Sequence, residues 1–409
     1  MIDFTPPREK LRACVIVPVR NEAQRLPATL QALAGQTDAP PYEVLVLANN
    51  CSDDSASIVR AFARLHPHVN LQVCEVTLPP PQANVGHARR LLMEEACRRL
   101  TWSGQRGAFI ASTDGDTRAA PDWLRHTARE IDAGADAVGG RLLAEGDAEA
   151  DADADEPSEV ARLRKRWQRW DTAYRLACQK LDSLLDPDDA DPWPRHHQHF
   201  GASLAVRADA YRAVGGMPDG VPWLEDEALV TALRRADRRI RHSCAVRVIT
   251  SSRREGRVDV GLSWQLREWD RQSREQGELQ VDDPADLHCL ILARHQLRGL
   301  WRRGFVAPRG DAQWEALARV LRLPADGLWR DALEVTTFGA LWHAVDEQRR
   351  ARGVQACRQV PVQQALAELR RLIDAATPAA GRAGLPRRPP RGQRAGAASW
   401  CAPAGSSIW

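Results

Sequence analysis

The sequence has no patterned cysteines, no long apolar run and almost no excess of charge of one sign. Its nine cysteines occur singly along 409 residues, which argues against a disulfide framework and for reduced thiols in a cytoplasm. No stretch approaches the roughly 18 consecutive apolar residues that a membrane span needs. Residues 1–12 also lack the apolar middle of a secretion signal. These absences predict a soluble cytoplasmic protein, or at most one bound peripherally at the inner face of a membrane.

The charge is nearly balanced overall but unevenly distributed. The net charge is +3, from 57 basic and 54 acidic residues, so no global field favours nucleic acid as a partner. Residues 145–159 carry eight acids and no base, whereas 377–409 carry five arginines and no acid. We expect a solvated acidic loop in the first segment and a disordered tail in the second.

Strand and helix signals alternate through the first 250 residues. Amphipathic, helix-like segments separate short apolar runs that predict buried strands at 13–18, 42–48, 71–76 and 107–113. This alternation predicts an α/β fold with a wound, mostly parallel sheet flanked by helices. In such sheets, ligands bind beyond the carboxyl ends of the strands.

The later part of the chain has a different pattern. A long helix is expected from Val160 to Leu185 and a strand at 202–207. Past about Gly261 the pattern becomes helical, with segments near 284–303, 311–322, 327–350 and 362–375. We therefore predict one α/β domain over 1–255 with 145–159 as an inserted loop, a helical C-terminal region over 256–376, and a disordered tail over 377–409.

Carboxylates gather where the predicted strands end. Asp114 and Asp116 directly follow the strand at 107–113. They could bracket a turn around Gly115, and Asp53 and Asp226 could each cap a helix. These separate interpretations do not explain why polar groups accumulate at the mouth of one sheet in a fixed order.

Five motifs carry a resemblance to a known family. They are "CVIVPVRNE", "VLVLANNCSDD", "ASTDGDT", "FGASLAVRADAYRAVGG" and "WLEDEALVTALRRA". In this order, over roughly residues 13–250, they resemble the motifs of the family 2 glycosyltransferases. The resemblance implies a GT-A type fold with a nucleotide-sugar-binding domain over 1–255. It also implies an inverting, non-processive hexosyl- or related transferase, which moves a sugar from a nucleotide-diphosphate sugar to an acceptor hydroxyl that the sequence does not identify.

The same resemblance assigns the Asp-x-Asp pair to a divalent cation, Mg²⁺ or Mn²⁺. The cation would bridge the two phosphates of the donor, with Asp114 facing the nucleotide and Asp116 the metal. Carboxylate oxygens suit both cations, and Gly115 would let the backbone approach the phosphates.

Donor binding is assigned to three further segments by the resemblance. The first loop would lie along the nucleoside, the second would read the base, and residues 83–96 would close over the nucleotide. Gly86 would form the turn before a helix from about His87 to Leu100. Arg89 or Arg90 could reach the phosphates, or both could lie on a solvated helix face. The donor-binding residues predicted in this way are Pro18, Arg20, Asn21, Glu22, Asn50, Ser52, Asp53, Gly86, Arg89, Arg90 and Asp114.

Asp226 matches the catalytic carboxylate of the family. It would act as the general base that removes the proton from the acceptor hydroxyl during attack on the anomeric carbon, and Glu225 is the nearest rival. Trp223 could stack on a sugar or pack locally. The histidines at 196, 197 and 199 could bind metal or acceptor, or lie in a surface loop.

The sequence departs from the family pattern at three places. Asn50 replaces a common carboxylate, which weakens the inference of a uridine nucleotide. Thr250, Ser251 and Ser252 stand where relatives carry a metal-binding histidine, which predicts weak metal binding in the free protein. In "QLREW" (265–269), Glu268 replaces the arginine of processive synthases, which argues against processive synthesis.

The alternatives to a glycosyltransferase are a nucleotidyltransferase and a non-catalytic binding protein. A sugar-phosphate nucleotidyltransferase needs a glycine-rich phosphate loop after the first strand, and "VPVRNEAQRL" has no glycine. A non-catalytic nucleotide-sugar-binding relative is opposed by the presence of Asp116 and Asp226. Asn50 and the missing histidine keep that alternative open.

Overall fold

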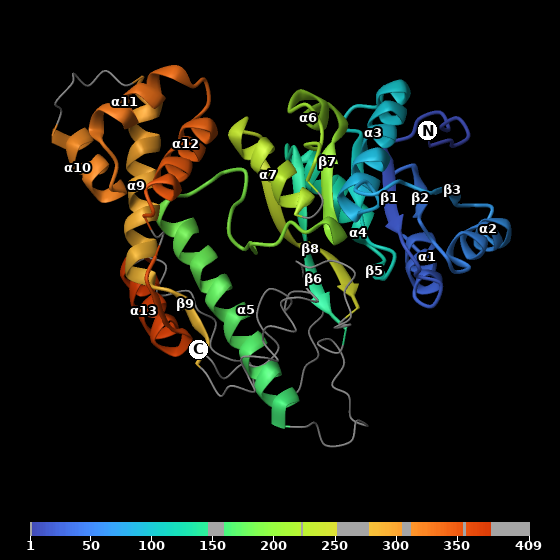
Figure 1. Cartoon of the computed structure of the whole chain (residues 1–409), viewed down its shortest axis with the longest axis horizontal. Helices are drawn as coiled ribbons and strands as arrows, with labels where there is room; N and C mark the ends of the chain where they lie inside the picture. The colour runs from blue at the N-terminus through green and yellow to red at the C-terminus, as the bar shows by residue number, and fades with distance from the viewer. Residues whose placement is uncertain are drawn as a thin grey trace. The chain divides into compact units, whose positions relative to one another are not determined.

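The computed structural model of the chain describes residues 2–145, 159–221, 224–251, 278–304, 312–354 and 357–377. The chain divides into two compact units (Figure 1). The first comprises Met1–Asp155 and Gln198–Glu268, and the second comprises Glu156–His197 and Trp269–Trp409. Trp223, Ser252, the "QLREW" motif, most of the predicted acidic loop and the predicted tail from 378 onward lie outside the described residues.

An eight-stranded sheet forms the centre of the first unit. Its strands are β1 (Ala13–Val19), β2 (Tyr42–Asn49), β3 (Asn70–Val76), β4 (Phe109–Ser112), β5 (Thr117–Ala119), β6 (Ala137–Ala144), β7 (Leu204–Arg207) and β8 (Ile240–Thr250). The strand order is β3-β2-β1-β4-β7-β6-β8-β5. Strands β3, β2, β1 and β4 run parallel, β7 is antiparallel to both of its neighbours, and β6 pairs in parallel with β8. The predicted wound, mostly parallel sheet is confirmed.

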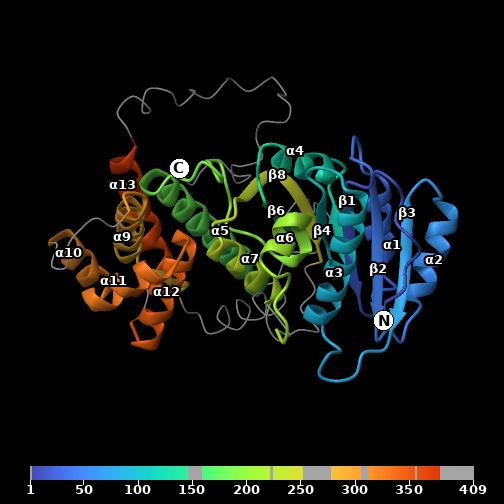
Figure 2. The ribbon, with the colours of Figure 1, turned by 90° about the horizontal axis from the view of Figure 1, so that it is seen from above.

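Helices cover both faces of this sheet (Figure 2). They are α1 (Leu26–Ala34), α2 (Ser55–Leu65), α3 (Val85–Ser103), α4 (Trp123–Asp132), α6 (Ala208–Ala213) and α7 (Glu225–Arg235). Alternate strand residues point to opposite faces. In β1, Cys14 and Ile16 pack in the core with α3, α6 and α7, whereas Val15 and Val17 pack with α1, α2 and α4. Burial on both faces explains why β1 and β2 are continuous apolar runs.

Three strands of the sheet, β5, β6 and β8, were not predicted from the sequence. In β6, two glycines obscure the strand pattern, because glycine weakens strand propensity. Both are required by close packing: a Cβ at Gly139 would lie 2.4 Å from the carbonyl oxygen of Gln198, and one at Gly140 would lie 2.1 Å from Ser203 Oγ. The ladder between β6 and β8 shifts register immediately after Gly140.

The second unit is mainly helical, which confirms the predicted helical C-terminal region. It contains α5 (Glu159–Leu185), α9 (Pro284–Arg302), α10 (Ala312–Leu321), α11 (Ala325–Glu334), α12 (Phe338–Ala351), α13 (Val362–Ala376) and the two-stranded ladder of β9 (Gln280–Asp282) and β10 (Gln359–Pro361). Leu297, Leu321, Leu341 and Val345 belong to a fully buried core there. Among the described residues, no helix combines the length and apolarity needed to cross a membrane.

Two details of this unit differ from the predictions. The helical segment expected at 327–350 is two helices, α11 and α12. Thr337 caps the start of α12, where its Oγ1 accepts a hydrogen bond from the amide of Ala340 at 3.3 Å. The chain also divides differently from the predicted boundary at 255. Helix α5 belongs to the second unit, where it packs on α9 and α13.

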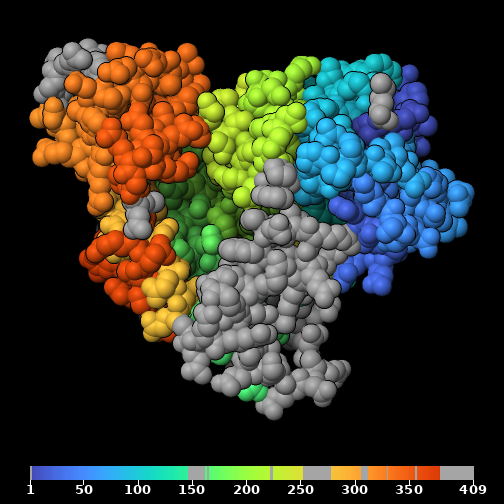
Figure 3. All heavy atoms as spheres, viewed as in Figure 1, coloured from blue at the N-terminus to red at the C-terminus, as the bar shows by residue number. Residues whose placement is uncertain are grey.

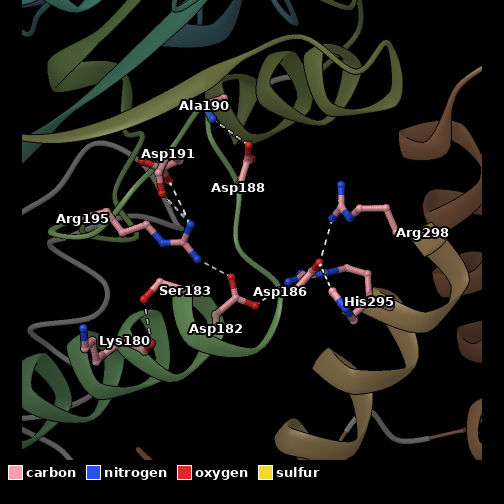
Figure 4. Close-up of polar contacts among 11 residues, drawn as sticks. Lys180, Asp182, Ser183, Asp186, Asp188, Ala190, Asp191, Arg195, His295 and Arg298 are labelled. Carbon is pink, nitrogen blue, oxygen red and sulfur yellow. Dashed lines mark hydrogen bonds and ion pairs between the residues drawn. The ribbon is translucent and has the colours of Figure 1, made fainter. Parts of the chain in front are cut away.

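Charged side chains join α5 to α9 inside the second unit (Figure 4). The side chain of Asp186 is only 1% exposed. It accepts hydrogen bonds from Arg294 Nε at 2.6 Å and Arg298 Nη2 at 3.0 Å, and His295 Nδ1 lies 3.2 Å away. Burial alone would raise the pKa of Asp186, but the two guanidinium groups outweigh burial, and the pKa is lowered.

Candidate functional site

The sheet topology brings the predicted site residues to one edge. The carboxyl ends of β1, β2 and β4 lie together because these strands are parallel. Strand β7 runs the opposite way, with Leu204 opposite Ser112, so it begins at the edge where β4 ends. Strand β8 also ends there, since Thr250 pairs with Thr117. Segments from five strands therefore contribute to one candidate site.

The Asp114-Gly115-Asp116 segment connects β4 to β5 at this edge. The carbonyl oxygen of Asp114 accepts a hydrogen bond from the amide of Thr117 at 3.2 Å, so the segment is also a turn. A Cβ at Gly115 would lie 3.1 Å from Val19 Cγ2 and 3.2 Å from Glu22 Cγ. The glycine therefore lets the turn pack closely on the first loop, which is a structural reason for its presence beside the predicted one.

Arg89 is the central cation of the site. It is 3% exposed and extends from the first half of α3. Its Nε donates to Ser112 Oγ at 3.1 Å, its Nη2 donates to Asp114 Oδ1 at 2.5 Å, and its Nη1 forms an ion pair with Glu225. Arg90 has different partners, Glu94 and Asp219. Of the two arginines that the sequence left open, only Arg89 contacts the candidate site in this way, and it is not on a solvated helix face.

Asp226 and Glu225 have contrasting environments at the start of α7. The Oδ2 of Asp226 accepts a hydrogen bond from the amide of Gly201 at 2.7 Å, and its Oδ1 accepts one from the amide of Glu227 at 2.8 Å. Asp226 is partly exposed, whereas Glu225 is 3% exposed and paired with Arg89. In the space-filling view, residues of α6 and α7 adjoin those of α3, and α3 packs directly on α6 (Figure 3).

The first and second loops are fastened to each other. Asn21 adopts a left-handed conformation, with φ of 51°, and its Oδ1 accepts a hydrogen bond from the amide of Ser52 at 2.7 Å. Asp53 accepts from the amide of Ala23 at 2.9 Å and from that of Ser55 at 3.1 Å. Asp53 thus supports the start of α2 and holds the first loop against it. The guanidinium of Arg20 reaches the carbonyl oxygen of Ala83 at 3.0 Å, so the predicted donor segments are connected.

Three of the predicted donor-binding residues, Pro18, Gly86 and Asn50, have structural roles. Pro18 is buried within β1, opposite Leu47, and does not lie in the loop. Gly86 does not form the turn before α3 but lies inside its first turn, and the cap is Asn84, whose Oδ1 accepts the amide of His87 at 2.9 Å.

Asn50 pairs with the backbone of one residue. Its Nδ2 donates to the carbonyl oxygen of Leu78 at 3.1 Å, and its Oδ1 accepts the amide of Leu78 at 3.0 Å. Its φ of 52° places it in the left-handed region, which asparagine tolerates better than most residues. The donor and the acceptor of this side-chain amide, which was expected to pair with a base, thus both bind Leu78.

The acidic pair suits only one kind of cation site. Within the described ranges, no group of three or more histidine, cysteine or acidic side chains is arranged to hold a metal ion. At the position where the missing histidine was expected, Thr250 Oγ1 lies 2.8 Å from the Oγ1 of Thr117, next to Asp116. Two carboxylates without a third protein ligand fit Mg²⁺-like coordination, in which phosphates and waters complete the shell.

The histidines at 196, 197 and 199 divide between the two units. His196 is buried in the second unit, and His199 belongs to the first. The Nε2 of His199 lies 2.6 Å from Glu227 Oε2, and its Nδ1 lies 3.3 Å from His242 Nε2. The contact with His199 lowers the pKa of Glu227, although burial opposes this shift. Sequence spacing offered no signal for this group, because its members come from three separate segments.

The comparisons with known proteins agree with the motifs. Residues 14–181 match the model of the family described as glycosyl transferase family 2. This match covers less than half of the chain. A segment of 130 residues is also 31% identical to glycosyltransferase AglE of Haloferax volcanii, which corresponds to 31% of this chain and 38% of AglE. The chain thus spans less than half the length of this curated relative.

Solved structures with similarity to this chain include two with bound nucleotide sugars. One is S. aureus TarS 1–349 in complex with UDP-GlcNAc, at 18% identity and a TM-score of 0.40, covering 83% of this chain and 92% of TarS 1–349. The other is the mannosyltransferase PcManGT from Pyrobaculum calidifontis in complex with GDP-Man and Mn²⁺. It has 17% identity and a TM-score of 0.41, and the match covers 92% of this chain and 89% of PcManGT.

Sequence reasoning missed two residues that shape this site, Ser112 and Gly201. Both occur in the quoted motifs, but neither received a role. The signal for Gly201 was its position directly before a predicted strand, where glycine often allows another group to approach the backbone closely. A Cβ at Gly201 would lie 2.5 Å from Arg89 Cζ, so the guanidinium rests directly on this residue.

Proposed function

We propose that this chain is a metal-dependent, inverting glycosyltransferase. It transfers a sugar from a nucleotide-diphosphate sugar to an acceptor hydroxyl, with Asp226 as the general base. The observation that carries the proposal is the gathering of Asp114, Asp116 and Asp226 at one edge of the sheet, beside a single buried cation, Arg89. The match of residues 14–181 to the model of glycosyl transferase family 2 supports the class of reaction.

Asp226 is better placed than Glu225 for general-base catalysis. A base must be reachable by the acceptor and free to take a proton. Glu225 is buried and ion-paired with Arg89, whereas Asp226 is partly exposed and held by two backbone amides. In the proposed step, Asp226 removes the proton from the acceptor hydroxyl as the oxygen attacks the anomeric carbon. The bond from that carbon to the diphosphate breaks on the opposite side, which inverts the configuration.

Asp116 and Asp114 would hold a Mg²⁺ or Mn²⁺ ion together with the donor phosphates. Such a cation would supply positive charge to the departing diphosphate. Asp114 shares one oxygen with Arg89, and the resemblance to the family assigns the metal to Asp116. The absence of a third protein ligand among the described residues leads us to expect weak metal affinity until a nucleotide supplies its phosphates.

A screen of nucleotide sugars tests this proposal directly. Thermal melting of the purified chain would be followed with UDP-, GDP-, TDP- and CMP-sugars, each with and without Mn²⁺. We expect one nucleotide to raise the melting temperature only with Mn²⁺, because a ligand that binds the folded state stabilises it by mass action. Asp116→Asn should lose this shift, whereas Asp219→Asn, a change in an exposed aspartate that pairs with Arg90, should keep it.

The outcomes separate the proposal from its alternative. A stabilising nucleotide without any turnover would favour a non-catalytic nucleotide-sugar-binding relative. If no nucleotide changes the melting temperature with or without Mn²⁺, the proposed donor site is wrong.

A further inference from the structure

We propose that Arg89 is a positioning residue that fixes the candidate base Asp226 through Glu225 and Gly201, rather than a ligand of the donor phosphates. The inference rests on the proposed role of Asp226. It also explains why a fully buried cation lies between two acidic segments that are far apart in the sequence.

The first step is the set of partners of the guanidinium. Each of its three nitrogens is engaged: Nε with Ser112 at 3.1 Å, Nη2 with Asp114 at 2.5 Å, and Nη1 with Glu225. The side chain is 4% exposed. A guanidinium is planar and presents its donors in a fixed fork. This geometry suits a rigid connection between β4 and α7 and leaves the cation enclosed within the protein.

The second step is the contact with Gly201. A Cβ at this residue would lie 2.5, 2.6 and 2.8 Å from Cζ, Nη1 and Nη2 of Arg89, so the guanidinium packs on the bare Cα. The amide of the same residue donates to Asp226 Oδ2 at 2.7 Å. Any displacement of Arg89 therefore changes the position of the peptide that holds the candidate base.

The third step is the beginning of α7. Leu224, directly before Glu225, has a φ of 61° and occupies the N-cap position without a side-chain cap. A bulky residue is strained in this left-handed region and remains there only when its surroundings impose the conformation. Because Glu225 is the first residue of α7 and its carboxylate is buried against Arg89, this ion pair is the contact that anchors the turn carrying Asp226.

Together these contacts connect the donor side of the site to the base. Arg89 binds Asp114, which is predicted to face the nucleotide, and also anchors the turn of Asp226. One buried cation thus sets the separation between the acidic pair and the base.

The test uses Glu225→Gln and Arg89→Lys, with Arg98→Lys as the control, because Arg98 is an exposed arginine of α3 that pairs with Glu95. Glu225→Gln removes the charge but keeps the shape, and it leaves Asp114 untouched. Turnover of the nucleotide sugar identified by the melting screen would be measured with Mn²⁺. We expect kcat to fall about 100-fold in both variants, because displacing a catalytic group by about 1 Å can lower the rate by that factor. The KM for the donor should change little in Glu225→Gln, and Arg98→Lys should change neither constant.

Hydrogen exchange provides a readout that needs no substrate. The amides of Gly201 and of residues 226–229 should exchange faster in Glu225→Gln and Arg89→Lys than in the unsubstituted chain, while peptides of β1 and β2 stay unchanged. Unchanged exchange at Gly201 and α7 in both variants would overturn the positioning role. A raised KM for the donor with unchanged kcat in Arg89→Lys would also overturn the positioning role, since it would indicate that Arg89 is a phosphate ligand.

This design separates the two proposals. If the unsubstituted chain turns over no nucleotide sugar, the proposed function fails, but the exchange measurement still decides whether Arg89 fixes the start of α7. If the chain is active and the exchange is unaffected, the function stands and the positioning role fails.

Discussion

Glu43 is the second residue of β2, and its side chain is fully buried, although glutamate is rarely found inside a protein without a partner. Its two carboxylate oxygens accept hydrogen bonds from Nε and Nη2 of Arg99 at 2.6 and 2.7 Å, and Arg99 is also completely buried. Asn70 Nδ2 adds a third hydrogen bond at 3.0 Å. The bidentate pair joins β2 to α3, the helix that also carries Arg89.

Glu43→Gln should destabilise the first unit strongly. The substitution removes the bidentate carboxylate partner of the buried Arg99 and leaves it only the longer contact with Glu95 at 3.3 Å, and breaking such a buried pair costs about 3–5 kcal/mol. Glu75→Gln is the control, because Glu75 pairs with Arg60 on the surface and an exposed pair contributes only about 0–1 kcal/mol. Urea unfolding of both variants measures the difference. Equal losses in the two variants would contradict the assigned role of Glu43.

Single residues of the site were predictable where a motif and a strand end coincide. Asp114 and Asp116 are such residues, since they follow β4 and parallel strands bring their carboxyl ends to one edge, whereas Asp226 lies at the start of α7 and was assigned by its motif alone. The partners of Arg89 were not predictable, because Ser112, Gly201 and Glu225 come from distant segments and meet only in the folded chain. The same is true of Asn50, whose pairing with Leu78 depends on the conformation of the loop after β3.

At the scale of elements, close packing decides which strands the sequence reveals. Strand β1 was predicted because burial on both faces demands a continuous apolar run. Strand β6 was hidden by Gly139 and Gly140, which packing against neighbouring backbone and side chains requires. The break between α11 and α12 had a readable signal in Thr337, a capping residue, but the apolar periodicity on either side concealed it.

Gly140→Ala should destabilise the first unit by about 1–3 kcal/mol or more, because an added methyl group in a filled core forces its neighbours to move. The new Cβ would lie 2.1 Å from Ser203 Oγ and 2.8 Å from Val246 Cγ1. Gly299→Ala in α9 is the contrasting change, since a Cβ there has its nearest neighbour, Arg303 Nη1, at 3.7 Å. That substitution should be neutral or stabilising by about 0.4–1 kcal/mol. Thermal melting distinguishes them, and tolerance of Gly140→Ala would show that β6 is packed more loosely than described.

At the scale of the whole molecule, the chain is organised as two units whose boundary does not follow sequence order. The prediction assigned α5 to the α/β domain because α5 precedes β7 in the chain. In the structure, α5 belongs to the helical unit, where Asp182 and Asp186 bind arginines of α9 and its buried face packs on α9 and α13. Sequence order alone could not reveal this, because the contacts join residues about a hundred positions apart.

The Asp186 network makes the stability of the second unit depend on pH. The pKa of Asp186 is lowered in the folded chain, so its ionised form stabilises the fold. This contribution is complete above the unfolded pKa of about 3.9 and is lost as the pH falls through the lower folded value. Asp186→Asn should therefore cost about 1.5–3 kcal/mol near neutral pH, the range for hydrogen bonds to charged groups.

Denaturant unfolding at a series of pH values tests this expectation. The difference between the unsubstituted chain and Asp186→Asn should narrow as the pH falls below about 3.9, because the carboxylate of the unfolded chain is protonated there while that of the folded chain takes up its proton only at a lower pH. A difference that stays constant from neutral to acidic pH would show that charge is not the source of the stabilisation.

The most direct test of the proposed function is the release of nucleoside diphosphate from the stabilising nucleotide sugar, with Mn²⁺ present. The chain, Asp226→Asn and Asp219→Asn would be compared under identical conditions. We predict that Asp226→Asn keeps the melting shift with nucleotide but loses about 10²–10⁴-fold in turnover, the range for a general base, whereas Asp219→Asn retains both. Turnover by Asp226→Asn at the unsubstituted rate would contradict the assignment of the base, and no turnover by any form would contradict the proposed enzyme.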